Sequence, residues 1–120
     1  MKRALGVCYY PEHWPEDMWP RDAARMVKAG ITWVRIGEFA WSRLEPQPGQ
    51  FDFGWLDRAI AALAEAGLKI VLGTPSATPP RWMLARFPDM LAHDATGRAR
   101  GFGSRRHYCH SHAGYRDAAA

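Results

Sequence analysis

The side chains best suited to chemistry in this 120-residue chain follow one short apolar stretch. Residues 31–36 (ITWVRI) are rich in β-branched side chains, which is typical of a buried strand. Glu38, Trp41, Arg43 and Glu45 follow within a few residues. Ligands of α/β folds bind at the carboxyl ends of the strands. The stretch therefore predicts the edge of a ligand-binding site.

Arg35 lies inside this apolar stretch and not after it. A guanidinium buried alone is costly, so it must be paired or must face a polar cavity. Its five N–H donors suit both a carboxylate and the hydroxyls of a sugar. Two interpretations stay open for Arg35, and equally for Arg105: a structural ion pair with Glu38 or Glu12, or a ligand contact.

A second group of polar side chains lies near the end of the chain. Residues 107–112 (HYCHSH) place one cysteine among three histidines. Thiolate and imidazole are zinc ligands, but structural zinc sites use four ligands at spacings such as C-x-x-C. The run by itself favours a polar loop in which the thiol of Cys109 is half-buried.

The elements that must position these side chains alternate along the chain. We expect strands at residues 5–9, 32–36 and 68–72 and helices at residues 19–29, 53–66 and 81–87, with a further helix opening near residue 115. The first strand is a continuous apolar run, which predicts burial of both its faces and of Cys8. Gly30 and Gly67 are placed to end the first two helices.

This order predicts the N-terminal portion, about three βα units, of a (β/α)₈ TIM barrel. The loops that follow the strands are long, whereas the turns at Gly30 and Gly67 are short. A doubly wound sheet is less favoured, because no glycine-rich phosphate loop follows the first strand. The final residues, 115–120 (YRDAAA), open a helix without a stop signal. We therefore expect residues 1–120 to be the N-terminal segment of a longer domain, incomplete at the C-terminus.

The composition and the charge pattern argue against several classes of protein. The chain is 48% hydrophobic and 23% charged, with a net charge of +4, which is an ordinary globular balance. Its four arginines between residues 98 and 106 make a thin case for nucleic-acid binding, because they belong to no known nucleic-acid-binding fold. No apolar run approaches the ~20 residues of a membrane span. Two distant cysteines form no disulfide framework, so we expect a cytoplasmic protein. From the apolar runs and the arginine segment, we expect no membrane partner and no nucleic-acid partner.

Five blocks of unusual composition occur in order along the chain: GVCYYPEHWP, VRIGEFAWSRLEP, GWLDRAI, GLKIVLGTPSATPPRW and GSRRHYC. Together they resemble the N-terminal part of the glycoside hydrolase family 42 β-galactosidases, over residues 5–120. The resemblance implies a TIM-barrel catalytic domain that releases terminal non-reducing β-D-galactose with retention, commonly as a homotrimer. The alternatives are another TIM-barrel glycosidase, acting on β-glucosides, mannosides or arabinosides, and a non-catalytic remnant.

Retaining hydrolysis needs two carboxyl groups about 5–5.5 Å apart. Glu12, Glu38 and Glu45 follow strand ends, and Glu38 is the best placed. From the residues alone, we expect Glu38 to pair with an arginine and shape the pocket floor. The resemblance agrees, because it places the acid/base and the nucleophile beyond Ala120. No catalytic residue is then expected here, and residues 1–120 alone should be inactive.

The resemblance assigns two further kinds of site. Arginines at the positions of Arg35 and Arg105 line the galactose subsite, which makes both residues candidates for substrate binding. Cys109 matches the first of four cysteines that bind a structural zinc in many family members, and its partners would lie past Ala120. No cofactor is expected for catalysis.

Overall fold

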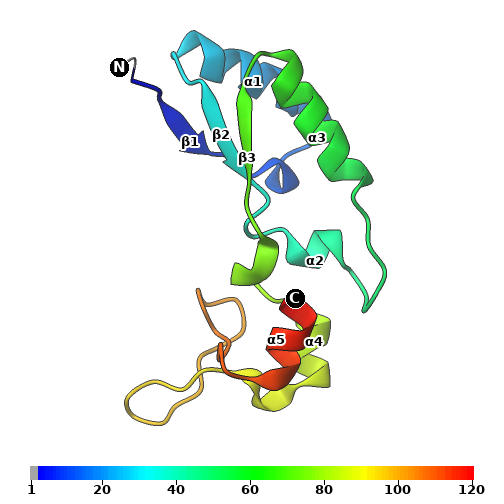
Figure 1. Ribbon diagram of the computed structural model, residues 1–120, viewed down its shortest axis with the longest axis vertical. Coiled ribbons are helices and arrows are strands. Elements are labelled where there is room, and N and C mark those ends of the chain that lie inside the picture. Colours follow the sequence, from blue (N-terminus) through cyan, green and yellow to red (C-terminus); the bar gives the residue numbers. More distant parts are fainter. Residues whose placement is uncertain (1–2) are drawn as a thin grey trace. The chain divides into compact units, whose positions relative to one another are not determined.

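The computed structural model describes residues 3–120, which form two compact units (Figure 1). The sheet unit comprises residues 3–38 and 53–74. The helical unit comprises residues 39–52 and 75–120. The segment that follows the second strand is thus divided, since Glu38 belongs to the sheet unit and Glu45 to the helical unit.

The sheet unit is built from parallel strands connected by helices. Its strands are β1 (Gly6–Cys8), β2 (Trp33–Ile36) and β3 (Lys69–Leu72), in the spatial order β1-β2-β3. Helix α1 (Trp19–Lys28) joins the first pair and helix α3 (Gly54–Glu65) the second, with the short 3-10 helices η1 (Pro11–His13) and η2 (Glu16–Met18) after β1. Both strand pairs are parallel, so the predicted order of βα units is confirmed.

Each of the two long helices buries one apolar face. Helix α1 carries Pro20 in its first turn and buries Trp19 and Ala23. Helix α3 buries Trp55, Leu56, Ala59 and Leu63. Gly30 and Gly67, which follow these helices, have φ angles of +82° and +88°. Residues other than glycine rarely adopt a positive φ angle, which explains why glycine ends both helices.

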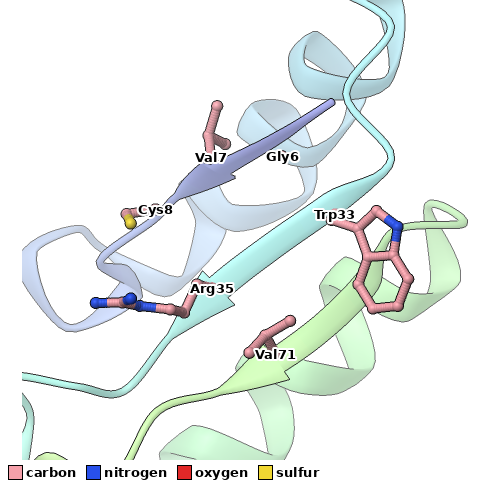
Figure 2. Close-up of a pocket in the computed structure, with 6 residues that line it drawn as sticks. All are labelled: Gly6, Val7, Cys8, Trp33, Arg35 and Val71. Carbon is pink, nitrogen blue, oxygen red and sulfur yellow. The ribbon is translucent and has the colours of Figure 1, made fainter. Parts of the chain in front are cut away.

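The sheet is covered on one face only. Val34 and Ile36 of β2 are fully buried, whereas Arg35, which lies between them, and Trp33, which precedes them, are exposed. Figure 2 shows Cys8, Arg35 and Val71 on the open face, with the helices behind the strands. The predictions of a first strand buried on both faces and of a buried Cys8 are wrong, because β1 is an edge strand with all of its residues exposed.

The helical unit contains short elements around an aromatic core. These are α2 (Trp41–Leu44), η3 (Pro75–Ala77), α4 (Arg81–Arg86), η4 (Pro88–Met90) and α5 (Ala113–Ala119). The core comprises Trp41, Met83, Met90, Tyr108 and Tyr115. The rings of Tyr108 and Tyr115 stack with their centroids 4.2 Å apart. Antiparallel bridges between Leu91 and Tyr108 and between His93 and Ala99 give the intervening loop the character of a hairpin.

Helix α2 was not expected from the sequence. It is a single turn within a stretch whose spacing showed no helical repeat. None of the helices among residues 3–120 is long and apolar enough to cross a membrane.

Candidate functional site

Two glycines, Gly37 after β2 and Gly73 after β3, determine the position of Glu38. Gly37 turns the chain after β2 with a φ angle of +88°. The backbone N–H of Gly73, just after β3, donates to the carbonyl of Ile36 at 2.8 Å. A Cβ atom at Gly73 would lie only 2.9 Å from the Cβ atom of Glu38. Glycine at residue 73 therefore makes room for Glu38, whose side chain is 6% exposed.

Arg35 and Glu38 form an ion pair. Arg35 Nε donates to Glu38 Oε1 at 3.0 Å. This hydrogen bond, together with the charge of Glu38, raises the pKa of Arg35 above its ordinary value. The pairing with an arginine expected for Glu38 is confirmed. The expectation that Arg35 is paired is confirmed as well, and its side chain is 51% exposed on the open face of the sheet.

A hollow of about 250 Å³ lies on this open face. It is lined by Gly6, Val7, Cys8, Trp33, Arg35 and Val71 (Figure 2). Its lining is mostly apolar, and Arg35 supplies the one permanent charge among these six residues. An apolar surface beside a fixed cation suits a ligand that has both an apolar face and oxygen atoms.

Glu45 occupies a different environment, inside the helical unit. Trp41 Nε1 donates to its Oε2 at 2.8 Å, and the backbone N–H of Gly49 donates to its Oε1 at 2.8 Å. The indole of Trp82 donates to the backbone carbonyl of Glu45 at 2.9 Å. Because these bonds tie α2 to the following loop and to α4, Glu45 serves the fold of this unit.

Arg105 belongs to the helical unit, whereas Arg35 belongs to the sheet unit. Arg105 is exposed, and its guanidinium lies 5.5 Å from the centre of the Phe39 ring, within the range of a cation–π contact. Its backbone carbonyl accepts from Arg100 Nη1 at 3.3 Å. Arg106, the next residue, has a φ angle of +55°, so the chain turns sharply beside Arg105.

Two other arginines of this segment, Arg98 and Arg100, bind groups within the chain. Arg98 pairs with Asp94 at 3.6 Å. Hydrogen bonds from Thr96 and from the backbone of Arg98 lower the pKa of Asp94. Arg100 donates to the carbonyls of Arg105 and Arg106. These contacts hold a loop, which is the ordinary role of such residues.

Cys109 is a half-buried free thiol whose backbone N–H donates to the carbonyl of Met90 at 2.7 Å. Residues 3–120 contain no group of three or more His, Cys, Asp or Glu side chains placed to hold a metal ion. His107 is buried and packs its ring against Tyr108, and His112 caps α5. The donors described here therefore do not complete a zinc site.

Sequence reasoning missed the part played by Gly73. The available signal was a glycine directly after an apolar strand, which indicates a close backbone approach. The residue it approaches lies in a different βα unit. Only the register of β2 with β3, which pairs Ile36 with Leu72, identifies it.

Comparison with known proteins gives consistent matches. The family model described as "Beta-galactosidase" (Glyco_hydro_42) matches residues 8–120. A beta-galactosidase from Thermus thermophilus is 62% identical over 115 residues, which are 96% of this chain and 18% of that protein. The beta-galactosidase Bga from Halorubrum lacusprofundi is 50% identical over 116 residues, 97% of this chain and 17% of that protein. The chain thus spans less than a fifth of the length of these relatives.

Solved structures agree. The crystal structure of a beta-galactosidase from the psychrophilic Marinomonas ef1 matches with a TM-score of 0.90 and 54% identity, over 98% of this chain and 18% of that chain. The Halorubrum lacusprofundi enzyme matches with a TM-score of 0.90 and 49% identity, over the same shares of the two chains. With the parallel βα units, this likeness confirms the predicted fold, the N-terminal portion of a (β/α)₈ barrel.

Proposed function

We propose, on the premise that the chain belongs to glycoside hydrolase family 42, that it is the N-terminal segment of the catalytic barrel of a retaining β-galactosidase. The observation that carries the proposal is the match of the family model over residues 8–120. The relatives that match nearly the whole of this chain are beta-galactosidases, and the chain covers less than a fifth of each. The activity therefore belongs to a protein longer than these residues.

Within that protein, this chain binds and orients the sugar. Arg35 and Arg105 donate hydrogen bonds to hydroxyls of the terminal galactose, and both are exposed and positively charged. Bonds of this kind fix the sugar ring relative to the reacting groups, which lowers the barrier by prior orientation. The nucleophile and the acid/base come from later strands. The pairing of Glu38 with Arg35, and of Glu45 with Trp41 and Gly49, supports structural roles for these two carboxylates.

Cys109 contributes one thiolate ligand to a structural zinc in this proposal, and the other ligands come from outside residues 3–120. Its half-buried thiol, held in a loop by the backbone bond to Met90, supports the assignment. Zinc bound by four ligands stabilises the local fold and takes no part in hydrolysis. Loss of zinc from a Cys109→Ser variant, measured by elemental analysis, is the expected result. Retention of one zinc per chain would contradict it.

The proposal also includes a homotrimer and a cytoplasmic location. Two free cysteines, Cys8 and Cys109, support a reducing compartment. The mass of the native assembly, measured by light scattering, tests the trimer.

The test of function is a substrate comparison with the full-length protein. Aryl β-D-galactoside, β-D-glucoside, β-D-mannoside and α-L-arabinoside are assayed side by side, and the anomer first released is identified by NMR. We expect the largest kcat/KM on the galactoside and release of β-galactose. A larger kcat/KM on another glycoside would overturn the galactosidase assignment while leaving the hydrolase class, and release of α-galactose would overturn retention. Residues 1–120 alone should show no turnover.

A further inference from the structure

The ion pair of Arg35 with Glu38 uses only part of each side chain. Arg35 donates through Nε to Glu38 Oε1 at 3.0 Å. Among residues 3–120, Arg35 Nη1 and Nη2 make no hydrogen bond, and Glu38 Oε2 is buried without a hydrogen-bond partner. The pair is therefore joined side-on, through one nitrogen and one oxygen.

Glu38 and Arg35 differ in their exposure to solvent, and this difference indicates which residue holds the other in place. The Glu38 side chain is 6% exposed and is confined between the ends of β2 and β3, where Gly73 approaches its Cβ atom. The Arg35 side chain is 51% exposed. A charge-assisted hydrogen bond to a desolvated carboxylate is stronger than one formed in water. Glu38 is thus the fixed anchor, and Arg35 is the group that it orients.

The anchored guanidinium keeps most of its hydrogen-bonding capacity. Guanidinium is planar and carries five N–H donors in a rigid fork. Once Nε is held by Glu38, the plane is fixed, and the donors on Nη1 and Nη2 have a set direction. Arg35 lines the hollow on the open face of the sheet (Figure 2). A fork of two nitrogens matches a ligand that offers two neighbouring oxygen atoms, such as the adjacent hydroxyls of a sugar.

We propose that Glu38 is a positioning residue: it holds Arg35 through Nε so that Nη1 and Nη2 together donate to two adjacent hydroxyls of the sugar. The inference rests on the proposed function, since it takes Arg35 as a substrate-binding residue. It goes further because it assigns sugar binding to Nη1 and Nη2 of Arg35, assigns Nε to the bond with Glu38, and makes Glu38 the residue that sets this division. Glu45, buried in the same way, has no such role because both its oxygens are bonded inside the helical unit.

A double-mutant cycle in the full-length protein tests this. Galactose serves as a competitive inhibitor, and its Ki is measured with KM and kcat for an aryl β-galactoside. We expect Glu38→Ala to raise Ki and KM by about tenfold or more, as for loss of a hydrogen bond to a charged group, with a smaller change in kcat. Glu38→Gln should restore much of the affinity, because its amide oxygen still accepts from Nε.

The decisive comparison is made in an Arg35→Ala background. If Glu38 acts through Arg35, adding Glu38→Ala there changes Ki by less than about twofold, because coupled residues are non-additive. A purely structural role would give the same loss in both backgrounds and would overturn the inference. Glu16→Gln is the matched control: it removes a carboxylate of the same unit that pairs with Arg58 on the surface, and Ki should not change.

The experiment separates this inference from the proposed function. If Glu38→Ala does not fold, the cycle is run with Glu38→Gln, which is expected to give a smaller rise in Ki that again disappears in the Arg35→Ala background. If the wild-type protein prefers another β-glycoside, the galactosidase assignment fails. The same cycle, measured with that glycoside and its free sugar, still decides the role of Glu38. Unchanged Ki for both Glu38 variants would overturn the inference in every case.

Discussion

Glu38 and Glu45 lie in one short stretch of the chain, and both are nearly inaccessible to solvent, with 5% and 7% of their surface exposed. Glu45 accepts hydrogen bonds on both carboxylate oxygens, from Trp41 and Gly49. Glu38 accepts on one oxygen, from the exposed Arg35, and its second oxygen has no partner among residues 3–120. Burial is therefore a poor guide to function here. The partners of each oxygen distinguish the glutamate that holds its own unit together from the glutamate that pairs with an exposed arginine.

The largest expected effect comes from removing the fully bonded carboxylate. Glu45→Ala leaves the buried indole N–H of Trp41 and the backbone N–H of Gly49 without their acceptor. Each orphaned donor is costly, so we expect a loss of about 2–4 kcal/mol in the free energy of unfolding, measured by urea denaturation of the full-length protein. The Ki for galactose should stay the same in the folded fraction. A changed Ki with unchanged stability would reverse the roles assigned to the two glutamates.

Gly73→Ala tests the position of Glu38 without altering its charge. The added Cβ atom would lie 2.9 Å from the Cβ atom of Glu38, so one of the two chain segments must move. Overpacking of this kind costs about 1–3 kcal/mol of stability. Because Glu38 moves with Arg35 attached, galactose should also bind less tightly. Gly97→Ala is not a suitable control because Gly97 has a positive φ angle, whereas Gly101→Ala, with open space around its Cα atom, should leave Ki unchanged.

Trp41→Phe separates packing from hydrogen bonding at Glu45. The ring of Trp41 is 5% exposed and packs in the core of the helical unit, and phenylalanine keeps part of that packing. The loss of one donor to a buried carboxylate should cost about 1–2 kcal/mol in the free energy of unfolding. The loss should be smaller when Trp41→Phe is added to Glu45→Ala, which has no acceptor for the indole N–H. Additive losses in the double variant would show that the bond contributes nothing to stability.

Tyr9 and Asp22 give the smallest expected effect, at a carboxylate that is only partly buried. Tyr9 donates to Asp22 Oδ2 at 2.9 Å, and the Asp22 side chain is 18% exposed. Burial, and then the hydrogen bond to Asp22, raise the pKa of Tyr9 above its ordinary value. The neutral hydroxyl is favoured in the folded protein, so its contribution is complete below the unfolded pKa of about 10 and is lost as pH rises above that value.

Tyr9→Phe should therefore lower the free energy of unfolding by about 0.5–1 kcal/mol at pH 7 to 9. The difference from wild type should shrink above about pH 10, where the unfolded tyrosine ionises and the phenylalanine cannot. Urea denaturation at several pH values measures both. A difference that grows with pH would mean that the ionised hydroxyl is the form stabilised by the fold.

Local patterns in the sequence were sufficient for the element order and for the ends of α1 and α3. Apolar spacing places Trp19 and Ala23 on one helix face, and a terminal glycine is recognisable without tertiary information. The pairing of Arg35 with Glu38 was also accessible as one of two interpretations, since the two residues flank a single turn.

Features that depend on distant residues were not accessible. The exposure of β1 depends on which elements cover the sheet, and the apolar run of residues 5–9 carries no information about that. The division of the segment after β2 into two units depends on packing against residues 75–120. The close approach of the backbone to Glu38 depends on Gly73, which follows the next strand.

The most direct test of the central claim is a crystal structure of the full-length protein with galactose bound. Glu38 Oε1 is expected to stay within hydrogen-bond distance of Arg35 Nε, 3.0 Å in the present structure. Arg35 Nη1 and Nη2 should donate to two adjacent hydroxyls of the sugar. A structure in which both Nη atoms bind protein groups alone, with the galactose held by other residues, would contradict the account.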